Sequence, residues 1–447
     1  MSGIQVSSKA LRDMQNQSLR DGIIGCLFGS ALGDAIGLYT EFLSADSSTR
    51  VYPSRSFILS PKSEATKLHS DAHRDPHQPG EWTDDTDHAL LILLSYLHKN
   101  GQEISARDFA VRLDIWVRQG LRALDTLPMG LGHTVGSTVR AKTFLEDPEA
   151  TARQRWKNSG YKAAANGSLM RTHPLGVICL QKSLEQTFKT AADFSAITHP
   201  DPRCVISCAI GTALVRGLIL RDIRQESDID ALIESAVSWL ASYRKEQLKD
   251  AARQDEPDLD LAELQRHAKV EKLTDLALDE PRKIGYVYKT LGSGLHLLRL
   301  AMRGTANLAA PLPAQTAAFE PLITDLIMLG GDADTNACFA GALVGAYLGF
   351  KALPPHWRDG LRHGEWLMAK AEGLCMMLDV VHGTYSGAQD TDTAPDGGRG
   401  FLTDAQMEEK VMRHMAGMVQ RLGEGADKRK GSSSWGWLSK KKMRRTG

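Results

Sequence analysis

Residues 21–42 read DGIIGCLFGSALGDAIGLYTEF, and the glycines of this stretch decide how the chain can pack. Gly25, Gly29, Gly33 and Gly37 recur at intervals of four, so they share one face of a helix. Each of them costs about 1 kcal/mol of helix propensity relative to alanine. A helix with four such residues needs a compensating contact, and the close approach of a neighbouring backbone supplies one. We therefore expect this helix at the centre of the molecule.

A second stretch, near the other end of the chain, has small residues at the same spacing. Residues 330–349 read GGDADTNACFAGALVGAYLG, and here Ala337, Gly341, Gly345 and Gly349 lie four residues apart. Small residues on both helices would let the two backbones approach each other closely. The pattern predicts that these two helices pack together.

Apolar residues elsewhere in the chain also follow a helical period. Few segments show the strict alternation and the β-branched residues that are typical of strands. The sequence therefore predicts an all-α fold, a compact bundle of many helices joined by turns that contain Gly and Pro. The helical spacing is clearest at Leu90, Leu91, Leu94 and Leu97, and at Phe109, Leu113, Trp116 and Val117.

Composition excludes few classes of function. The chain has 447 residues, of which 42% are hydrophobic, and Lys+Arg and Asp+Glu both total 54. This balance neither requires nor excludes nucleic acid. The longest apolar run, residues 89–94, is too short to span a bilayer, and the polar N-terminus lacks a signal-peptide core, so we expect no membrane association. Six cysteines without metal-ligand spacing are expected to be reduced, as in a cytoplasmic protein.

Changes in composition predict the domain organisation. We expect one domain over residues 1–425, with a variable surface loop at 44–80 and a charged helical insertion at 241–283. Residues 426–447 are basic and rich in Ser and Gly, which predicts a disordered tail. The two Lys/Arg clusters of this tail leave a nuclear address as an alternative to the cytoplasm. A nucleic-acid partner is expected only through the same tail.

Two segments begin a helix with acidic residues and a threonine. One is GEWTDDTDHALLILL at residues 80–94, and the other opens the stretch at 330–349. Helix capping is one interpretation, since Asp and Thr side chains accept hydrogen bonds from the free N–H groups of a first turn. The residues concerned are Thr83, Asp84, Asp85, Asp332, Asp334 and Thr335.

A metal site is the second interpretation of these helix starts. Together they contain four carboxylates, while Asp34 and Glu41 belong to the glycine-rich helix or its end. If these groups converge, their mutual repulsion requires a cation. Hard oxygen ligands suit Mg²⁺ or Mn²⁺ better than zinc or copper. The residues alone leave capping and metal binding both open.

Six motifs, taken in order, resemble the ADP-ribosylglycohydrolase family. They are GSALGDAIGLYTEF, GEWTDDTDHALL, NGSLMRTHPLGV, ITHPD, IGYVYKTL and LGGDADTNACFAGALVGAYLG, which lie between residues 22 and 349. The resemblance implies an all-α orthogonal bundle with a cleft that holds two Mg²⁺ or Mn²⁺ ions. It implies that Thr83, Asp84, Asp85, Asp332, Asp334 and Thr335 are the metal ligands, and that Glu41 is a catalytic or metal-gating residue. Asp34 is then expected to be a supporting residue.

The resemblance also implies a set of substrate-binding residues. Gly167 would let backbone N–H groups approach a phosphate, and Ser168 would offer a hydroxyl. His199 could equally be a structural histidine, and Tyr286 could stack on adenine. The whole set is Asn166, Gly167, Ser168, Met170, His199, Gly132 and Tyr286.

Asp87 and His88 depart from the pattern of several relatives, which have apolar or small residues there. Asp87 lies three residues after Asp84 and shares its helical face, so we expect it to support the metal ligands.

The function predicted from these motifs is hydrolysis of the glycosidic bond between ADP-ribose and a modified side chain. Metal-bound water would be deprotonated by Asp85 or Asp334, with Glu41 as proton donor or base. The partner is then an ADP-ribosylated protein, with arginine linkage favoured over serine linkage. Two alternatives stay open: a catalytically silent ADP-ribose-binding protein, and a hydrolase of small ADP-ribose derivatives such as O-acyl-ADP-ribose.

Overall fold

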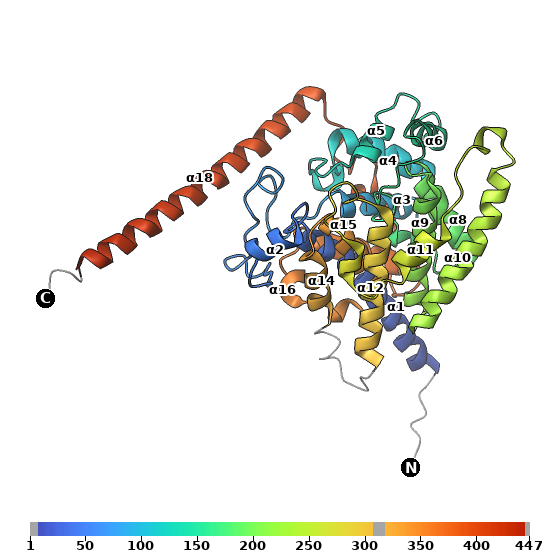
Figure 1. Cartoon of the computed structure of the whole chain (residues 1–447), viewed down its shortest axis with the longest axis horizontal. Helices are drawn as coiled ribbons and strands as arrows, with labels where there is room; N and C mark the ends of the chain where they lie inside the picture. The colour runs from blue at the N-terminus through green and yellow to red at the C-terminus, as the bar shows by residue number, and fades with distance from the viewer. Residues whose placement is uncertain (1–7, 307–317, 443–447) are drawn as a thin grey trace, which may run out of the picture. The chain divides into compact units, whose positions relative to one another are not determined.

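The computed structural model describes residues 8–306 and 318–442, and within these ranges the regular structure is helical. The β contacts among the described residues are two isolated antiparallel bridges, Ser44 with Gly330 and Ala165 with Tyr286. Figure 1 shows helices α1 and α15 among the surrounding helices. The predicted all-α fold class is confirmed.

The helices are numbered along the chain as in Figure 1. The α-helices are α1 (Ser8–Gly37), α2 (Ala45–Val51), α3 (Asp84–His98), α4 (Ala106–Gln119), α5 (His133–Val139), α6 (Pro148–Asn158), α7 (His173–Ile178), α8 (Leu184–Ala196), α9 (Pro202–Ile219), α10 (Glu226–Gln247), α11 (Leu261–Ala268), α12 (Val287–Ala306), α14 (Phe319–Ile327), α15 (Ala333–Leu348), α16 (Pro355–Arg358), α17 (Gly364–Met377) and α18 (Asp404–Lys442). Short 3₁₀ helices are η1 (Arg122–Leu124), η2 (Ala251–Arg253), η3 (Leu273–Leu276), η4 (Phe350–Ala352), η5 (Gly387–Gln389) and η6 (Thr391–Thr393).

The chain divides into two compact units. The larger takes its described residues from Met1–Thr66 and Pro79–Gly400, and the smaller from Lys67–Gln78 and Phe401–Gly447. The predicted domain end at residue 425 falls within the single long helix α18, residues 404–442, and stays a prediction. This helix covers most of the tail that the sequence predicts to be disordered. It starts in a run of strong helix formers, AQMEEKVMRHMA, which favours helix over coil.

Helices α1 and α15 touch backbone to backbone along their glycine faces. A Cβ added to Gly29 would lie 2.2 Å from the carbonyl oxygen of Gly341, and one added to Gly341 would lie 2.1 Å from that of Gly29. At the end of α1, a Cβ on Gly37 would lie 2.3 Å from the Cα of Asp334. No side chain fits at these positions, so glycine is required by the approach itself. The predicted pairing of the two helices is confirmed.

The remaining core helices surround this pair with apolar side chains. Helix α9 is long and apolar enough to cross a membrane by length and composition, yet 89% of its window is buried inside the protein, as in a core helix. All six cysteines are free and buried. Burial raises the pKa of the Cys26 thiol, which keeps it protonated. These cysteines therefore act as small apolar core residues.

The predicted surface loop at 44–80 is more ordered than its composition suggests. Residues 45–51 form α2, and Tyr52 and Phe57 are buried against Tyr39 in a cluster of edge-to-face rings. Apart from α2 the segment has irregular backbone, and these three rings bury each other only in the folded chain.

The charged insertion at 241–283 consists of the end of α10, then η2, α11 and η3. Several of its charges pair with each other or with α6, and apolar residues such as Leu264 and Leu276 are buried. The insertion is helical as predicted, but it is packed onto the body of the larger unit.

Replacing Gly29 by Ala should destabilise the protein by about 3 kcal/mol or more, because the added methyl group meets a backbone carbonyl that cannot move away. Gly304 in α12 is the matched control, since a Cβ there meets nothing within 4 Å. Gly304→Ala should be neutral or stabilise by up to about 1 kcal/mol. Urea unfolding followed by circular dichroism measures both, and equal effects would contradict the proposed backbone contact.

His173 should make the stability of the protein sensitive to acid. Burial lowers its pKa from 6.5 to about 4, so the unfolded chain takes up the proton first as pH falls. The contribution of neutral His173 to the free energy of unfolding is complete above pH 6.5 and is lost towards pH 4. Between these values the free energy of unfolding changes by about 1.4 kcal/mol per pH unit. Between pH 7 and 5, the unfolding free energy of wild type should fall with pH more steeply than that of His173→Gln, and the difference should be about this slope. Substitution of the exposed His382 should leave the slope unchanged.

Candidate metal centre and cleft

Three chain segments bring the acidic residues together: the end of α1, the start of α3 and the start of α15. The turn after α1 pairs with the loop before α15, where Phe42 N donates to Gly331 O and Gly331 N donates to Leu43 O. Gly330 and Gly331 have φ values of +68° and +72°, a conformation that favours glycine. This pairing holds the turn that contains Glu41 beside the N-terminus of α15.

Asp34 caps helix α3 from a different helix. Its carboxylate accepts hydrogen bonds from the backbone N–H and the hydroxyl of Thr83, at 3.0 Å each, and from the N–H and hydroxyl of Thr86, at 3.0 and 2.6 Å. The N-cap residues of the two helices, Thr83 and Asp332, make no side-chain cap hydrogen bond of their own. Helix capping therefore does not account for the side chains of Thr83 and Asp332.

The carboxylates form two clusters that share one residue. Ligand atoms of Asp34, Asp85 and Asp334 lie within 4.8 Å of one another, and so do those of Glu41, Asp332 and Asp334. The Thr83 hydroxyl lies 3.1 Å from Asp85 Oδ2. Asp34, which the sequence analysis treats as a supporting residue, is thus one of the clustered acids.

Burial and mutual repulsion act on several of these acids. Desolvation, followed by the neighbouring carboxylates, raises the pKa values of Asp84, Asp85 and Asp334 well above their ordinary range. Oδ1 of Asp85 is buried without a hydrogen-bond partner in the described part of the chain. Divalent cations would remove both penalties, since they neutralise the charge and take the unused oxygen. The all-oxygen donor set fits Mg²⁺ or Mn²⁺.

Asp84 lies outside both clusters but close to them. Gly130, with φ +82°, faces it so closely that a Cβ would lie 2.3 Å from Asp84 Oδ1. The loop that contains Gly130 ends at Gly132, the N-cap of α5, which is exposed. This loop therefore borders the acidic centre, although only Gly132 was expected there from the sequence.

Asn166 connects the acidic centre to the loop at 164–172. Its Nδ2 donates to Asp332 Oδ2 at 2.8 Å and to the Thr290 hydroxyl at 2.9 Å, and Thr290 in turn donates to Asn336. Sequence reasoning missed Thr290 and Asn336, which bear on the site only because α12 packs on α15. Asn166 acts here as an orienting group for a candidate metal ligand.

The other residues of this loop have different surroundings. Gly167 leaves room for the ring of His199, because a Cβ would lie 3.2 Å from the imidazole Cε1. Ser168 and Met170 are buried, and the Ser168 hydroxyl accepts a hydrogen bond from Ser195. Ser168 therefore faces the protein interior in this structure.

His199 is buried, yet part of it lacks a partner. Its Nδ1 lies 2.8 Å from the Thr198 hydroxyl, while Nε2 has no hydrogen-bond partner among the described residues. Burial and the charge of Arg171 lower the pKa of His199 to about 3, so the ring is neutral. A neutral imidazole with one unused nitrogen can donate to or accept from a ligand.

Asp87 differs from the expectation that it supports Asp84. Its two oxygens accept hydrogen bonds from the indole N–H groups of Trp82 and Trp116, at 2.9 and 2.8 Å. Burial raises its pKa to about 7. Asp87 thus joins α3 to α4 and to Trp82 before Thr83. Trp116 lies 29 residues away, so its contact gives no local sequence signal.

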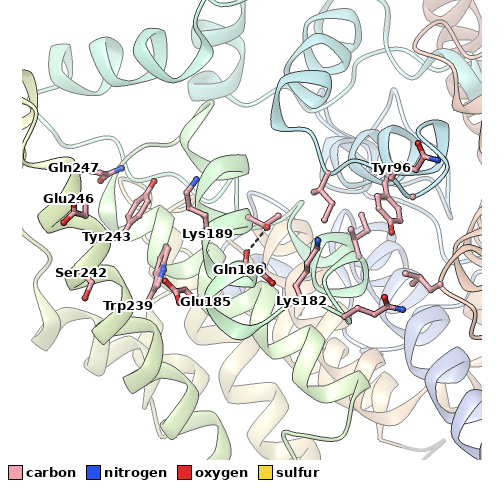
Figure 2. Close-up of a pocket in the computed structure, with 17 residues that line it drawn as sticks. Tyr96, Lys182, Glu185, Gln186, Lys189, Trp239, Ser242, Tyr243, Glu246 and Gln247 are labelled. Carbon is pink, nitrogen blue, oxygen red and sulfur yellow. Dashed lines mark hydrogen bonds between the residues drawn. The ribbon is translucent and has the colours of Figure 1, made fainter.

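A separate groove lies at the other end of α3. It has a volume of about 1110 Å³, and its lining includes Lys189 of α8, Tyr243 of α10, Tyr96 of α3 and Lys182 before α8 (Figure 2). The helix rises 1.5 Å per residue, so Tyr96 lies roughly 16 Å along α3 from Asp85. The groove is therefore distinct from the acidic centre.

Comparison with known proteins agrees with this geometry. Residues 15–386 match the family model described as ADP-ribosylglycohydrolase. The chain is 28% identical to ADP-ribosylarginine hydrolase Tri1 of Serratia proteamaculans, over 81% of each chain. It is 24% identical to ADP-ribosylhydrolase ARH3 of Bos taurus, over 78% of this chain and 91% of that one.

A solved structure titled ADP-ribosylglycohydrolase-related protein complex has the same fold. It matches with a TM-score of 0.50 and 24% identity, covering 81% of this chain and 99% of that chain. The family model spans more than half of the chain and includes both acidic clusters and the loop at 164–172. The chain belongs to the ADP-ribosylglycohydrolase family.

Proposed function

We propose that the protein is a metal-dependent hydrolase that releases ADP-ribose from a modified protein side chain, with arginine as the favoured acceptor. The observation that carries the proposal is the pair of buried acid clusters that share Asp334, since buried carboxylates in such number require cations. The relatives named as hydrolases of ADP-ribosyl groups support the reaction class. The relative named for arginine has the higher identity of the two, which supports the choice of acceptor.

The metal ligands proposed are Thr83, Asp84, Asp85, Asp332, Asp334 and Thr335, around two Mg²⁺ or Mn²⁺ ions. Bound there, the ions would supply positive charge and Lewis acidity for a glycosidic cleavage. Asp34 contributes by holding the start of α3, and Asn166 by holding Asp332. All six expected ligand residues are present, which favours an enzyme over a silent ADP-ribose-binding protein.

The proposed reaction is hydrolysis at C1″ of the ADP-ribose. Water adds its oxygen to C1″, the bond from C1″ to the acceptor nitrogen or oxygen breaks, and the acceptor leaves with a proton. Asp85 or Asp334 accepts the proton from water, and Glu41 gives one to the leaving group. His199 and Tyr286 border the space in which the ADP-ribose would lie.

Purified protein should release free ADP-ribose from an arginine-linked peptide in Mg²⁺, and chelator should abolish the release. A serine-linked peptide run in parallel names the linkage, and O-acyl-ADP-ribose tests the small-molecule alternative. Release from the serine peptide alone would overturn the arginine assignment. If ADP-ribose binds but no substrate turns over, the silent binding protein is the correct description.

Asp334→Asn should reduce turnover at least about 100-fold, because it removes a ligand shared by both clusters. In wild type, Mg²⁺ or Mn²⁺ should raise the melting temperature, since the ion binds only the folded state. This increase should be lost in Asp334→Asn. Glu185→Gln, in the distant groove of Figure 2, is the control and should keep both activity and metal response. A full metal response in Asp334→Asn would mean that the metal lies elsewhere.

A further inference from the structure

Tyr286 lies beside the acidic centre through a short pairing of two loops. Asn166 N donates to Gly285 O at 3.0 Å, and Ala165 and Tyr286 form an isolated β-bridge. Gly285 touches the centre, because a Cβ on it would lie 3.2 Å from Asp332 Oδ2. The aromatic ring of Tyr286 thus follows directly after a residue that contacts a candidate metal ligand.

The side chain of Tyr286 is hydrogen-bonded to Glu263 and surrounded by polar and aromatic groups. Its hydroxyl donates to Glu263 Oε1 at 2.9 Å. The guanidinium of Arg203 lies 5.8 Å from the ring centroid, and the rings of His267 and Tyr288 lie 5.8 and 5.5 Å away. Tyr286 is only half-buried, so part of its ring remains accessible to a ligand.

Glu263 belongs to α11, inside the charged insertion that the family resemblance left without a role. Helix α11 lies directly on α12: a Cβ on Gly292 would meet His267 O at 2.7 Å, and Leu264 is fully buried. The carboxylate of Glu263 is therefore carried on a packed helix rather than on a loose loop.

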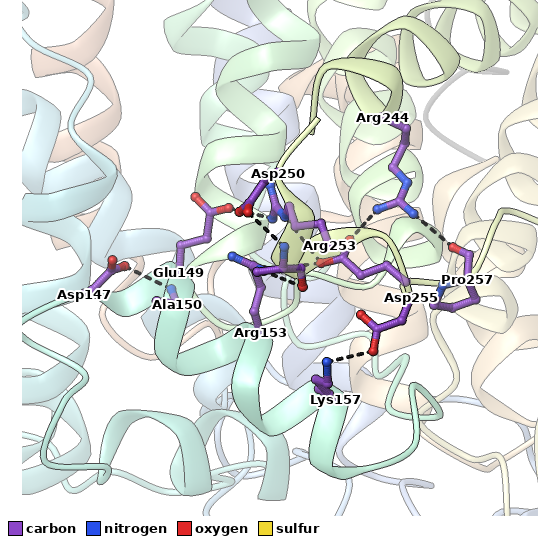
Figure 3. A network of polar contacts seen from close by, with 12 residues as sticks. Asp147, Glu149, Ala150, Arg153, Lys157, Arg244, Asp250, Arg253, Asp255 and Pro257 are labelled. Atoms are coloured by element: carbon purple, nitrogen blue, oxygen red, sulfur yellow. Dashed lines mark hydrogen bonds and ion pairs between the residues drawn. The ribbon is translucent and has the colours of Figure 1, made fainter. Parts of the chain in front are cut away.

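The first half of the insertion is tied to α6 by ion pairs (Figure 3). Lys157 pairs with Asp255 at 2.7 Å, and Arg253 pairs with Glu149 at 2.8 Å. Glu256, which is buried, pairs with three arginines of α6, α10 and η2, namely Arg153, Arg244 and Arg253. Buried and multiply bonded pairs of this kind fix geometry more than they add stability.

Helix α6 is linked to the same ring through Asp201 and Arg203. The indole of Trp156 donates to Asp201 Oδ2 at 2.8 Å, and Asp201 holds Arg203 at 2.6 Å. Arg203 in turn lies over Tyr286. The insertion therefore acts on Tyr286 both through Glu263 and through its anchor on α6.

We propose that Glu263 is a positioning residue that fixes the ring of Tyr286, next to the Gly285 backbone that contacts Asp332, so that the charged insertion sets the affinity for the nucleotide end of the ligand. This inference rests on the proposed function, since it takes ADP-ribose as the ligand. A base stacks well only on a ring whose orientation is already fixed, because ordering a free ring on binding costs affinity.

Titration calorimetry with ADP-ribose in Mg²⁺ tests the proposal. Glu263→Ala should weaken binding about tenfold and raise KM for the substrate similarly, with kcat at saturation little changed. Glu263→Gln keeps an oxygen that accepts from the Tyr286 hydroxyl, so it should stay within about threefold of wild type. Glu271→Ala, an exposed acid of the same insertion, is the matched control and should bind as wild type does.

A double-mutant cycle distinguishes action through Tyr286 from a general structural effect. Tyr286→Phe keeps the ring but not the hydrogen bond, so it should weaken binding as Glu263→Ala does, and the two changes together should cost no more than one. Independent, additive losses would overturn the positioning role, as would wild-type affinity in Glu263→Ala. If wild type itself neither binds nor releases ADP-ribose, the proposed function fails and this inference fails with it.

Discussion

The structure depends on the backbone contact between α1 and α15. A Cβ on Gly29 or Gly341 would collide with the backbone carbonyl of the other helix. Only glycine fits at these two positions, and this requirement sets the register of the two helices. The same contact ends at Gly37, against Asp334, and therefore fixes where the acids of α15 lie relative to the turn after α1. The four glycines would weaken an isolated helix, but the close packing that positions the acids requires them.

The acidic centre is costly for the folded protein unless a cation is bound. Burial raises the pKa of Asp334 and of its neighbours, since water no longer solvates their charges. Asp34 is the exception in its bonding, because four donors from α3 satisfy it. Asp34 caps α3 from a different helix, while the side chains of Thr83 and Asp332 make no cap hydrogen bond of their own. Helix capping therefore accounts for Asp34 but not for these two neighbouring side chains.

The insertion shows how a charged segment can bear on a site that it does not enter. Its composition is that of a solvated helix, and sequence patterns of that kind usually indicate solubility alone. In the folded chain Glu256 forms ion pairs with three arginines, and Glu263 accepts a hydrogen bond from the hydroxyl of Tyr286. Pairing partners that lie about a hundred residues apart, such as Arg153 and Glu256, leave no local signature.

The sequence by itself determined the all-α class, the pairing of the two glycine-rich helices and the family, because these follow from periodicity and from motifs that are local in the chain. It also indicated the acids of the two helix starts. Only the tertiary structure decided that Asp34 joins the acid cluster, that Asp87 turns to two tryptophans, and that Ser168 faces inward. The reason is physical: a residue's type and spacing fix the face of its own helix, whereas the partner that satisfies a buried polar group comes from whichever distant segment packs against that face.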